Sequence, residues 1–391
     1  MHSEQEQQKQ QQKQKATTQD IYKLYKMDVS YFSGKVEAYL RYKGIPYEGI
    51  ECLDDMKALQ RVGQHTGVQK VPAIEMPDGL WLHDTTPMMQ WLEQKHGGLC
   101  VLPTDPALRF VALLIEDYAD EWLWRPAMWW RWMPKSSRVA LGRRIAKVFS
   151  KPLAGSLGFY FAHRQMKEWL WDDGVTRDNI DDVRDMLFRE LEFLEPLFEE
   201  QPFILGSHPS VADFGYFASF FRHFGNDPIS AEVVRREGPN THEWLGRLWN
   251  AKPNKLSKQQ EWVWPKAPYW QPLLARIAQD YLPYLHQNAL AFQAGQKRFD
   301  HHGTTFIFKQ TKTTHYRVWC RQELQREFTM LTQEDQSRVT ALFENAGGLA
   351  TLHQDGVIYS GMTEQFQLPI DPTKLKHKPS LMTRLLGQPR N

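Results

Sequence analysis

The sequence has 391 residues, of which 41% are hydrophobic and 13% aromatic, with 48 basic and 46 acidic side chains and a net charge of +2. This length and composition allow a large buried core and predict two or three domains. The near balance of charge gives no electrostatic basis for binding nucleic acid or anionic membranes. No run of eighteen or more apolar residues is present, so we expect no membrane-spanning helix.

The cysteines and histidines also limit the function. Cys52, Cys100 and Cys320 form no C-x-x-C pair and no even disulfide framework, which favours a reduced, cytoplasmic compartment. The fourteen histidines show no metal-ligand spacing, so we predict no metal site. We expect the pair His301 and His302 to lie in a solvated turn.

Residues 1–20 are rich in Gln and Lys and have almost nothing to bury, so a disordered polar tail is expected. Residues 21–98 then follow the order β-α-β-α-β-β-α. Apolar periodicity and turn signals place strands at 21–27, 47–52, 71–76 and 80–83, and helices at 35–44, 57–64 and 86–98. This order is typical of a thioredoxin-like domain.

Residues 106–250 read as all-helical. Their clearest helix, 178–200, repeats apolar residues at spacings of three and four: Met186, Leu187, Leu191, Leu194 and Leu197.

The extension 252–391 is mixed. It has a helical pattern at 273–295, a β-like run at 304–320, helical stretches at 321–328 and 332–348, the last opening with a capping signal, and a basic, loose end. No motif assigns this extension a role.

Four segments carry a resemblance to a known family. They are VSYFSGKVEAYLRYKGIPYE at 29–48, KVPAI at 70–74, LHDTTPM at 82–88, and FILG at 203–206 with SVAD at 210–213. In this order they resemble the cytosolic glutathione transferases over residues 21–250. The resemblance implies an α+β fold, with a thioredoxin-like glutathione-binding domain followed by an all-helical domain.

Glutathione is a tripeptide thiol, and the loop before the first helix is where the resemblance places its sulfur. A free thiol has a pKa near ~8.5, and a helix N-terminus with a nearby hydroxyl stabilises the thiolate. Ser30 and Tyr31 are alternatives for the catalytic hydroxyl, and we expect Ser33 to be the N-cap of the helix. No cysteine lies in this loop, which argues against mixed-disulfide chemistry.

The resemblance also implies residues that hold the rest of glutathione. Pro72 resembles the family's cis-proline, which leaves the backbone of Val71 open to the cysteinyl unit. Lys70 would meet the glycyl carboxylate. Thr85 would bind the γ-glutamyl carboxylate and Asp84 the ammonium, where the family usually has glutamate and serine.

Two further groups lie in the helical half. Trp124, Arg125 and Trp129 could line an apolar second-substrate pocket that accepts a negative group, although packing in the core is an alternative. Ser210 and Asp213 form an S-x-x-D box, which we interpret as a structural helix cap.

The leading hypothesis is a glutathione transferase acting on an electrophilic, apolar or aromatic substrate, as a homodimer. The alternative is a non-catalytic binding or assembly module on the same fold, since fold does not fix function. Arg317, Arg321 and Arg326 raise the question of nucleic-acid binding, but we expect them on a solvated amphipathic face and predict no nucleic-acid partner.

Overall fold

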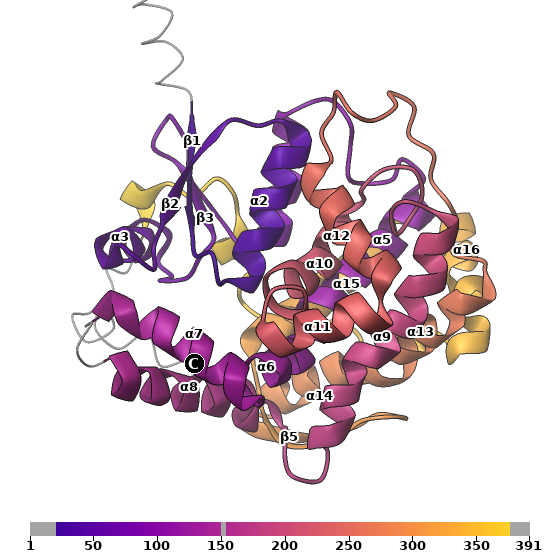
Figure 1. The fold of residues 1–391 in the computed structure, drawn as a ribbon. Helices are drawn as coiled ribbons and strands as arrows, with labels where there is room; N and C mark the ends of the chain where they lie inside the picture. Colours follow the sequence, from indigo (N-terminus) through magenta and orange to yellow (C-terminus); the bar gives the residue numbers. More distant parts are fainter. Residues whose placement is uncertain (1–20, 150–153, 376–391) are drawn as a thin grey trace, which may run out of the picture. The chain divides into compact units, whose positions relative to one another are not determined.

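A computed structural model describes residues 21–149 and 154–375 of the chain (Figure 1). Its contacts divide these residues into two compact units. The first contains residues 21–96 and 366–375, and the second contains residues 97–365. The expected polar tail, 1–20, and most of the expected basic end, 376–391, lie outside the described residues.

The first unit is built on a four-stranded sheet in the order β2-β1-β3-β4, with β1 and β2 parallel and the other pairs antiparallel. The elements follow the predicted order, so the thioredoxin-like arrangement is confirmed. They are β1 (Tyr22–Lys26), α2 (Tyr31–Lys43), β2 (Tyr47–Glu51), α3 (Met56–Thr66), β3 (Ala73–Glu75), β4 (Trp81–His83) and α4 (Thr85–Lys95).

Local signals explain where these helices begin and end. Gly44 ends α2 with a φ of 68°, a left-handed conformation that glycine adopts without steric cost. Asp55 begins α3, because its carboxylate accepts a hydrogen bond from the Lys57 N–H at 2.9 Å.

The second unit begins with a helical domain, as predicted. Its helices are α5 (Pro106–Glu121), α6 (Trp124–Trp132), α7 (Lys135–Phe149), α8 (Ala154–Trp169), α9 (Ile180–Glu200), α10 (Val211–Ser219), α11 (Pro228–Glu237) and α12 (Pro239–Asn250). Helix α10 is entirely buried and packs on α5. The five apolar residues predicted to form one face of α9 are all buried.

Helices α7 and α8 lie side by side, as Figure 1 shows. They approach closely at two glycines: a Cβ on Gly142 would lie 2.8 Å from the carbonyl oxygen of Gly158. Any larger residue would force the two helices apart at this point.

The extension continues the second unit as far as residue 365. Its elements are α13 (Gln271–Arg276), α14 (Leu282–Gln293), β5 (Arg298–His302), β6 (Ile307–Lys312), α15 (His315–Thr329), α16 (Gln333–Phe343) and α17 (Ala350–His353), with short 3-10 and π turns between them. Helices α15 and α16 pack on α5. Residues 252–365 therefore share a core with the helical domain.

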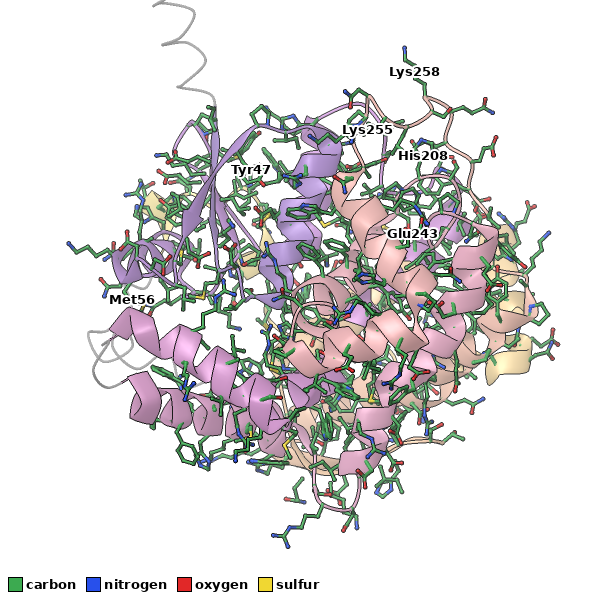
Figure 2. All side chains as sticks on the ribbon, viewed as in Figure 1. Tyr47, Met56, His208, Glu243, Lys255 and Lys258 are labelled. Carbon is green, nitrogen blue, oxygen red and sulfur yellow. The ribbon has the colours of Figure 1, made fainter. Side chains whose placement is uncertain are left out.

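The connection to this extension is held by backbone pairing. The Ser207 N–H donates to the carbonyl of Glu261 at 3.0 Å. Gly206, with a φ of 131°, lets the two segments meet, because a Cβ at this position would clash with that same carbonyl oxygen. Figure 2 labels Lys255 and Lys258 on this connection, with Lys258 pointing outward.

Three predictions about the extension are wrong. The strand-like run does not reach residue 320, because helix α15 begins at His315. His301 is fully buried in β5 and does not lie in a solvated turn. Arg317 and Arg321 are also buried. Arg317 pairs with a carboxylate and Arg321 donates to backbone carbonyls, and these groups take the place of solvating water. Of the three arginines, only Arg326 lies on an exposed face.

Candidate functional site

The first helix of the first unit begins four residues earlier than predicted. Tyr31 is the first residue of α2, and Ser30 is its N-cap, with the hydroxyl oxygen accepting from the Ser33 N–H at 3.3 Å. The prediction of Ser33 as the cap is therefore wrong. Ser33 is fully buried, and its hydroxyl instead accepts from the Met27 N–H at 3.2 Å.

The position of the helix start places the two candidate hydroxyls in different surroundings. Ser30 is half-buried at the helix N-terminus, and its O–H can still donate while its oxygen caps the helix. Tyr31 is 1% exposed, with its ring 4.7 Å from that of Phe32. Of the two side chains, Ser30 is therefore the more exposed.

The second helix N-terminus of the site lies where β4 runs into α4. Asp84 is the N-cap of α4 and has a φ of 71° with a ψ of 129°, a positive-φ conformation outside the left-handed helical region that residues with side chains seldom adopt. Such backbone strain concentrates at ligand-binding positions, where the surrounding structure maintains it. Thr85, the first residue of α4, is 6% exposed.

Lys35 joins these two helix ends, and sequence reasoning missed it. Its side chain is fully buried, and its Nζ donates to Thr85 Oγ1 at 3.2 Å. An ammonium can only donate, so the Thr85 oxygen accepts here and the threonine proton remains for another acceptor. Lys35 is the fifth residue of α2, and its local sequence gives no signal for a contact with a residue 50 positions away.

A second set of contacts holds α2 against α4. Lys43 forms an ion pair with Glu93 at 3.0 Å between side chains that are 2% and 5% exposed. Tyr39 donates to the same carboxylate at 2.7 Å. Both contacts lie toward the C-terminal ends of the two helices, away from Lys35 and Thr85.

The peptide bond between Val71 and Pro72 is cis. Among the described residues, no backbone hydrogen bond of Val71 is present, so its N–H and C=O remain open to an added strand. Lys70 is exposed. Burial lowers the pKa of His83 to about 4, with the charge of Lys70 as a second cause, so His83 is neutral at physiological pH.

In the second unit, Arg125 of the proposed second-substrate group is fully buried. Its Nε lies 3.2 Å from the Asp173 carboxylate, and its guanidinium carbon lies 4.5 Å from the centre of the Tyr284 ring and 4.3 Å from that of Phe308. Arg317 pairs with the same carboxylate, and these cations hold the pKa of Asp173 below its usual value despite burial. Arg125 thus has a packing partner on each side and no open face.

Trp124 and Trp129 are half-buried on α6. Trp124 packs edge-on against Trp169, with ring centres 4.9 Å apart, and Trp129 packs edge-on against Trp130 at 5.0 Å. Because both side chains are half-buried, only part of each ring is open to a ligand.

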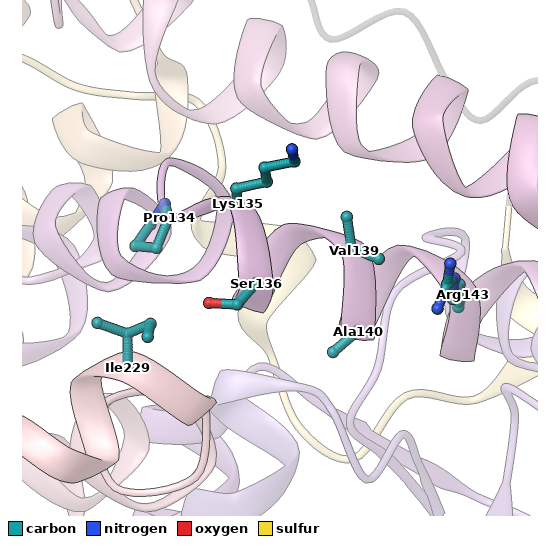
Figure 3. A pocket seen from close by; sticks show the side chains of 7 residues that line it. All are labelled: Pro134, Lys135, Ser136, Val139, Ala140, Arg143 and Ile229. Atoms are coloured by element: carbon teal, nitrogen blue, oxygen red, sulfur yellow. The ribbon is translucent and has the colours of Figure 1, made fainter.

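An open hollow of about 720 Å³ lies between the start of α7 and α11 (Figure 3). Its lining is mainly apolar, with two cations and one hydroxyl: Pro134, Lys135, Ser136, Val139, Ala140, Arg143 and Ile229. No predicted site residue lines it.

Ser210 and Asp213 hold the start of α10. The Asp213 carboxylate accepts from the Ser210 N–H and hydroxyl, both at 2.8 Å, from the Ile204 N–H at 2.9 Å, and from the Trp244 indole at 3.1 Å. All of these groups are buried, so this box stabilises the fold and is closed to ligand.

Within the described residues, no cluster of His, Cys, Asp or Glu could hold a metal ion. In the same part of the chain, no helix combines the length and apolar character needed to cross a membrane.

The fold and site define a protein with a thioredoxin-like domain, in which Lys35 of α2 contacts Thr85 at the start of α4, and a following helical domain. Residues 24–99 match the model of the glutathione S-transferase N-terminal domain, and residues 177–247 match that of the C-terminal domain. Residues 24–99 and 177–247 therefore correspond to the two domains of the glutathione S-transferase family, in the usual order, and a further region follows them in the chain.

Similar solved structures include the β-etherase LigF from Sphingobium, at 19% identity, covering 58% of this chain and 94% of that one, with a TM-score of 0.43. A glutathione S-transferase-like protein from Pseudomonas syringae is 19% identical, covering 59% and 66%, with a TM-score of 0.42. A Drosophila mojavensis homologue with bound glutathione is 16% identical, covering 65% and 91%, with a TM-score of 0.36. No curated protein sequence matches the chain.

Proposed function

We propose that this protein binds glutathione in its first unit and activates the thiol for transfer to an electrophilic substrate. The observation that carries the proposal is the hydrogen bond from Lys35 to Thr85, which joins the N-terminal ends of α2 and α4. Each helix end presents N–H groups and a positive dipole to an anion. Two such ends suit a ligand with a carboxylate at one place and a thiolate at another.

The γ-glutamyl end of glutathione would lie at the start of α4. The Thr85 hydroxyl donates to the carboxylate, because its oxygen already accepts from Lys35. The charge of Lys35 adds attraction across a buried, low-dielectric path. Asp84 meets the ammonium.

The middle and far end of the tripeptide would follow the loop before β3. Val71 pairs its open N–H and C=O with the cysteinyl unit, as an added strand would. Lys70 meets the glycyl carboxylate. This path leads the cysteinyl side chain toward the N-terminus of α2.

Ser30 would donate to the sulfur and, with the dipole of α2, favour the thiolate over the thiol. Glutathione supplies the nucleophile: its thiol proton leaves to solvent, the sulfur bonds to the electrophilic carbon, and the leaving group departs. Tyr31 is the alternative donor. Because Arg125 is buried and paired, we keep only Trp124 and Trp129 as candidates for contact with an apolar second substrate.

Calorimetric titration with glutathione tests the proposal. Thr85→Val removes the donor to the carboxylate and should weaken binding about tenfold, since a hydrogen bond to a charged group contributes roughly 1.5–3 kcal/mol. Thr86→Val, on the next residue of α4, is the matched control and should bind as the wild type does. No binding at millimolar glutathione, or an equal loss in both variants, contradicts the proposal.

Binding without transfer to any model electrophile would favour the alternative, a non-catalytic binding module. The family resemblance also leads us to propose a homodimer, which sedimentation of the purified protein tests. Cys52, Cys100 and Cys320 form no disulfide with one another, which supports a reducing, cytoplasmic location that imaging of a tagged chain tests.

A further inference from the structure

The last described segment of the chain returns to the first unit. Residues from Phe366 onward belong to that unit, although the residues just before them belong to the second. The Trp81 N–H donates to the Ile370 carbonyl at 2.9 Å, and the Ile370 N–H donates to the Trp81 carbonyl at 2.7 Å. Because β4 is an edge strand of the sheet, this pairing covers backbone groups that would otherwise be open.

Apolar side chains of the segment complete a buried cluster. Ile370 is 9% exposed and packs with Trp81 of β4 and with Val62 of α3, which are 1% and 0% exposed. Leu368 and Leu375 pack against the same cluster. The turn Pro372–Lys374 contacts α3. We call residues 366–375 the clasp; through Ile370, with Leu368 and Leu375 beside it, the clasp contributes to the core of the first unit.

The clasp shares two elements with the proposed glutathione site. Strand β4, which pairs with Ile370, runs without a break into Asp84 and Thr85. Val71, whose backbone is proposed to pair with the cysteinyl unit, packs its side chain against the same cluster. Displacing the clasp would therefore remove a backbone partner of β4. It would also remove Ile370 from the cluster against which the Val71 side chain packs.

We propose that docking of the clasp and binding of glutathione are coupled, so that each strengthens the other. This inference rests on the proposed function. The docked clasp holds β4 and Val71 in the geometry that binds glutathione, and bound glutathione in turn favours the docked clasp. The coupling is reciprocal because it is a free energy shared by two binding events. The extension thereby acts on the site in the first unit through the clasp.

Full-length Ile370→Ser tests the coupling. The matched control is Ile358→Ser, since Ile358 is 7% exposed and packs with Ala289 and Val318 in the second unit. Hydrogen exchange at the Trp81 amide reports docking, and calorimetry reports glutathione affinity. We expect Ile370→Ser to speed exchange at Trp81 and to weaken glutathione binding at least threefold, while Ile358→Ser changes neither. Glutathione should slow exchange at Trp81 in the wild type.

The outcomes separate the coupling from the proposed function. If Ile370→Ser speeds exchange at Trp81 but binds glutathione as the wild type does, the coupling is wrong and the proposed function stands. If exchange at Trp81 does not change in Ile370→Ser, the clasp does not depend on this residue and the inference is overturned. Failure of the wild type to bind glutathione overturns both. If Ile370→Ser does not fold, Leu375→Ser at the edge of the cluster provides the same comparison.

Discussion

Acid should destabilise this protein through His301, and a neighbouring histidine provides the control. His301 is fully buried in β5, with its Nδ1 paired to Gln287 Oε1 at 3.0 Å and its ring centre 5.3 Å from that of Tyr284. Burial lowers the pKa of His301 to about 3, and the nearby charges of Arg125 and His302 add to this effect.

The direction follows from proton binding. In the unfolded chain, His301 has the ordinary histidine pKa of 6.5 and binds a proton below that pH. In the folded chain, its side chain stays neutral down to about pH 3. The contribution of His301 to the free energy of unfolding is therefore fully present above pH 6.5 and is lost progressively as the pH drops toward 3. Each pH unit in this window costs up to about 1.4 kcal/mol, so lowering the pH from 7 to 5 costs about 2 kcal/mol through this residue.

Urea unfolding at pH 7 and pH 5 measures this effect. His301→Asn keeps a donor near Nδ1 but does not titrate, so the loss of stability between the two pH values should shrink by about 2 kcal/mol. His302→Asn changes an exposed residue of the same strand and should keep the wild-type loss. An equal loss in the wild type and in His301→Asn would refute the reasoning.

Three further predictions concern the two units. Lys35→Met should weaken glutathione binding about tenfold. The control Lys43→Met breaks a buried ion pair on the same helix and should lower stability without weakening binding. Equal losses of affinity in the two variants would show that Lys35 acts only through helix packing. Arg317→Met should lower the free energy of unfolding by about 3–5 kcal/mol, because it removes one of the cations paired with the buried Asp173 carboxylate. A change below about 1 kcal/mol in a urea titration would contradict this prediction. Alkylation under native conditions should label half-buried Cys100 before Cys52, because burial raises the pKa of the Cys52 thiol to about 12. Peptide mass mapping measures the order, and earlier labelling of Cys52 would contradict the prediction.

The first unit could be predicted because its signals are local. Alternating apolar residues, the Pro77-Asp78-Gly79 turn and Gly44 at a helix end each depend on a few neighbouring residues, and the sheet follows from their order. The start of α2 was misplaced for the same kind of reason. Ser30 and Ser33 are both good N-caps, and only the hydrogen bond between them decides which one begins the helix.

Long-range contacts could not be predicted in this way. Lys35 lies 50 residues from Thr85 in the chain, and no pattern around either residue indicates the contact. The expectation of a solvated amphipathic face for the arginines of α15 was wrong for the same reason. Arg317 is charged and would normally be solvated, but Asp173 and Glu121 meet it from elements far away in sequence.

The pKa of the glutathione thiol when bound to the protein is the most direct test of the central claim, that this fold binds glutathione and activates its sulfur. Thiolate absorbance in the ultraviolet, followed against pH at saturating protein, measures it. We expect a pKa clearly below the ~8.5 of a free thiol, rising toward that value in Ser30→Ala, or in Tyr31→Phe if the phenol is the donor. Saturable binding with an unshifted thiol pKa would contradict thiol activation and leave a glutathione-binding module without transferase chemistry.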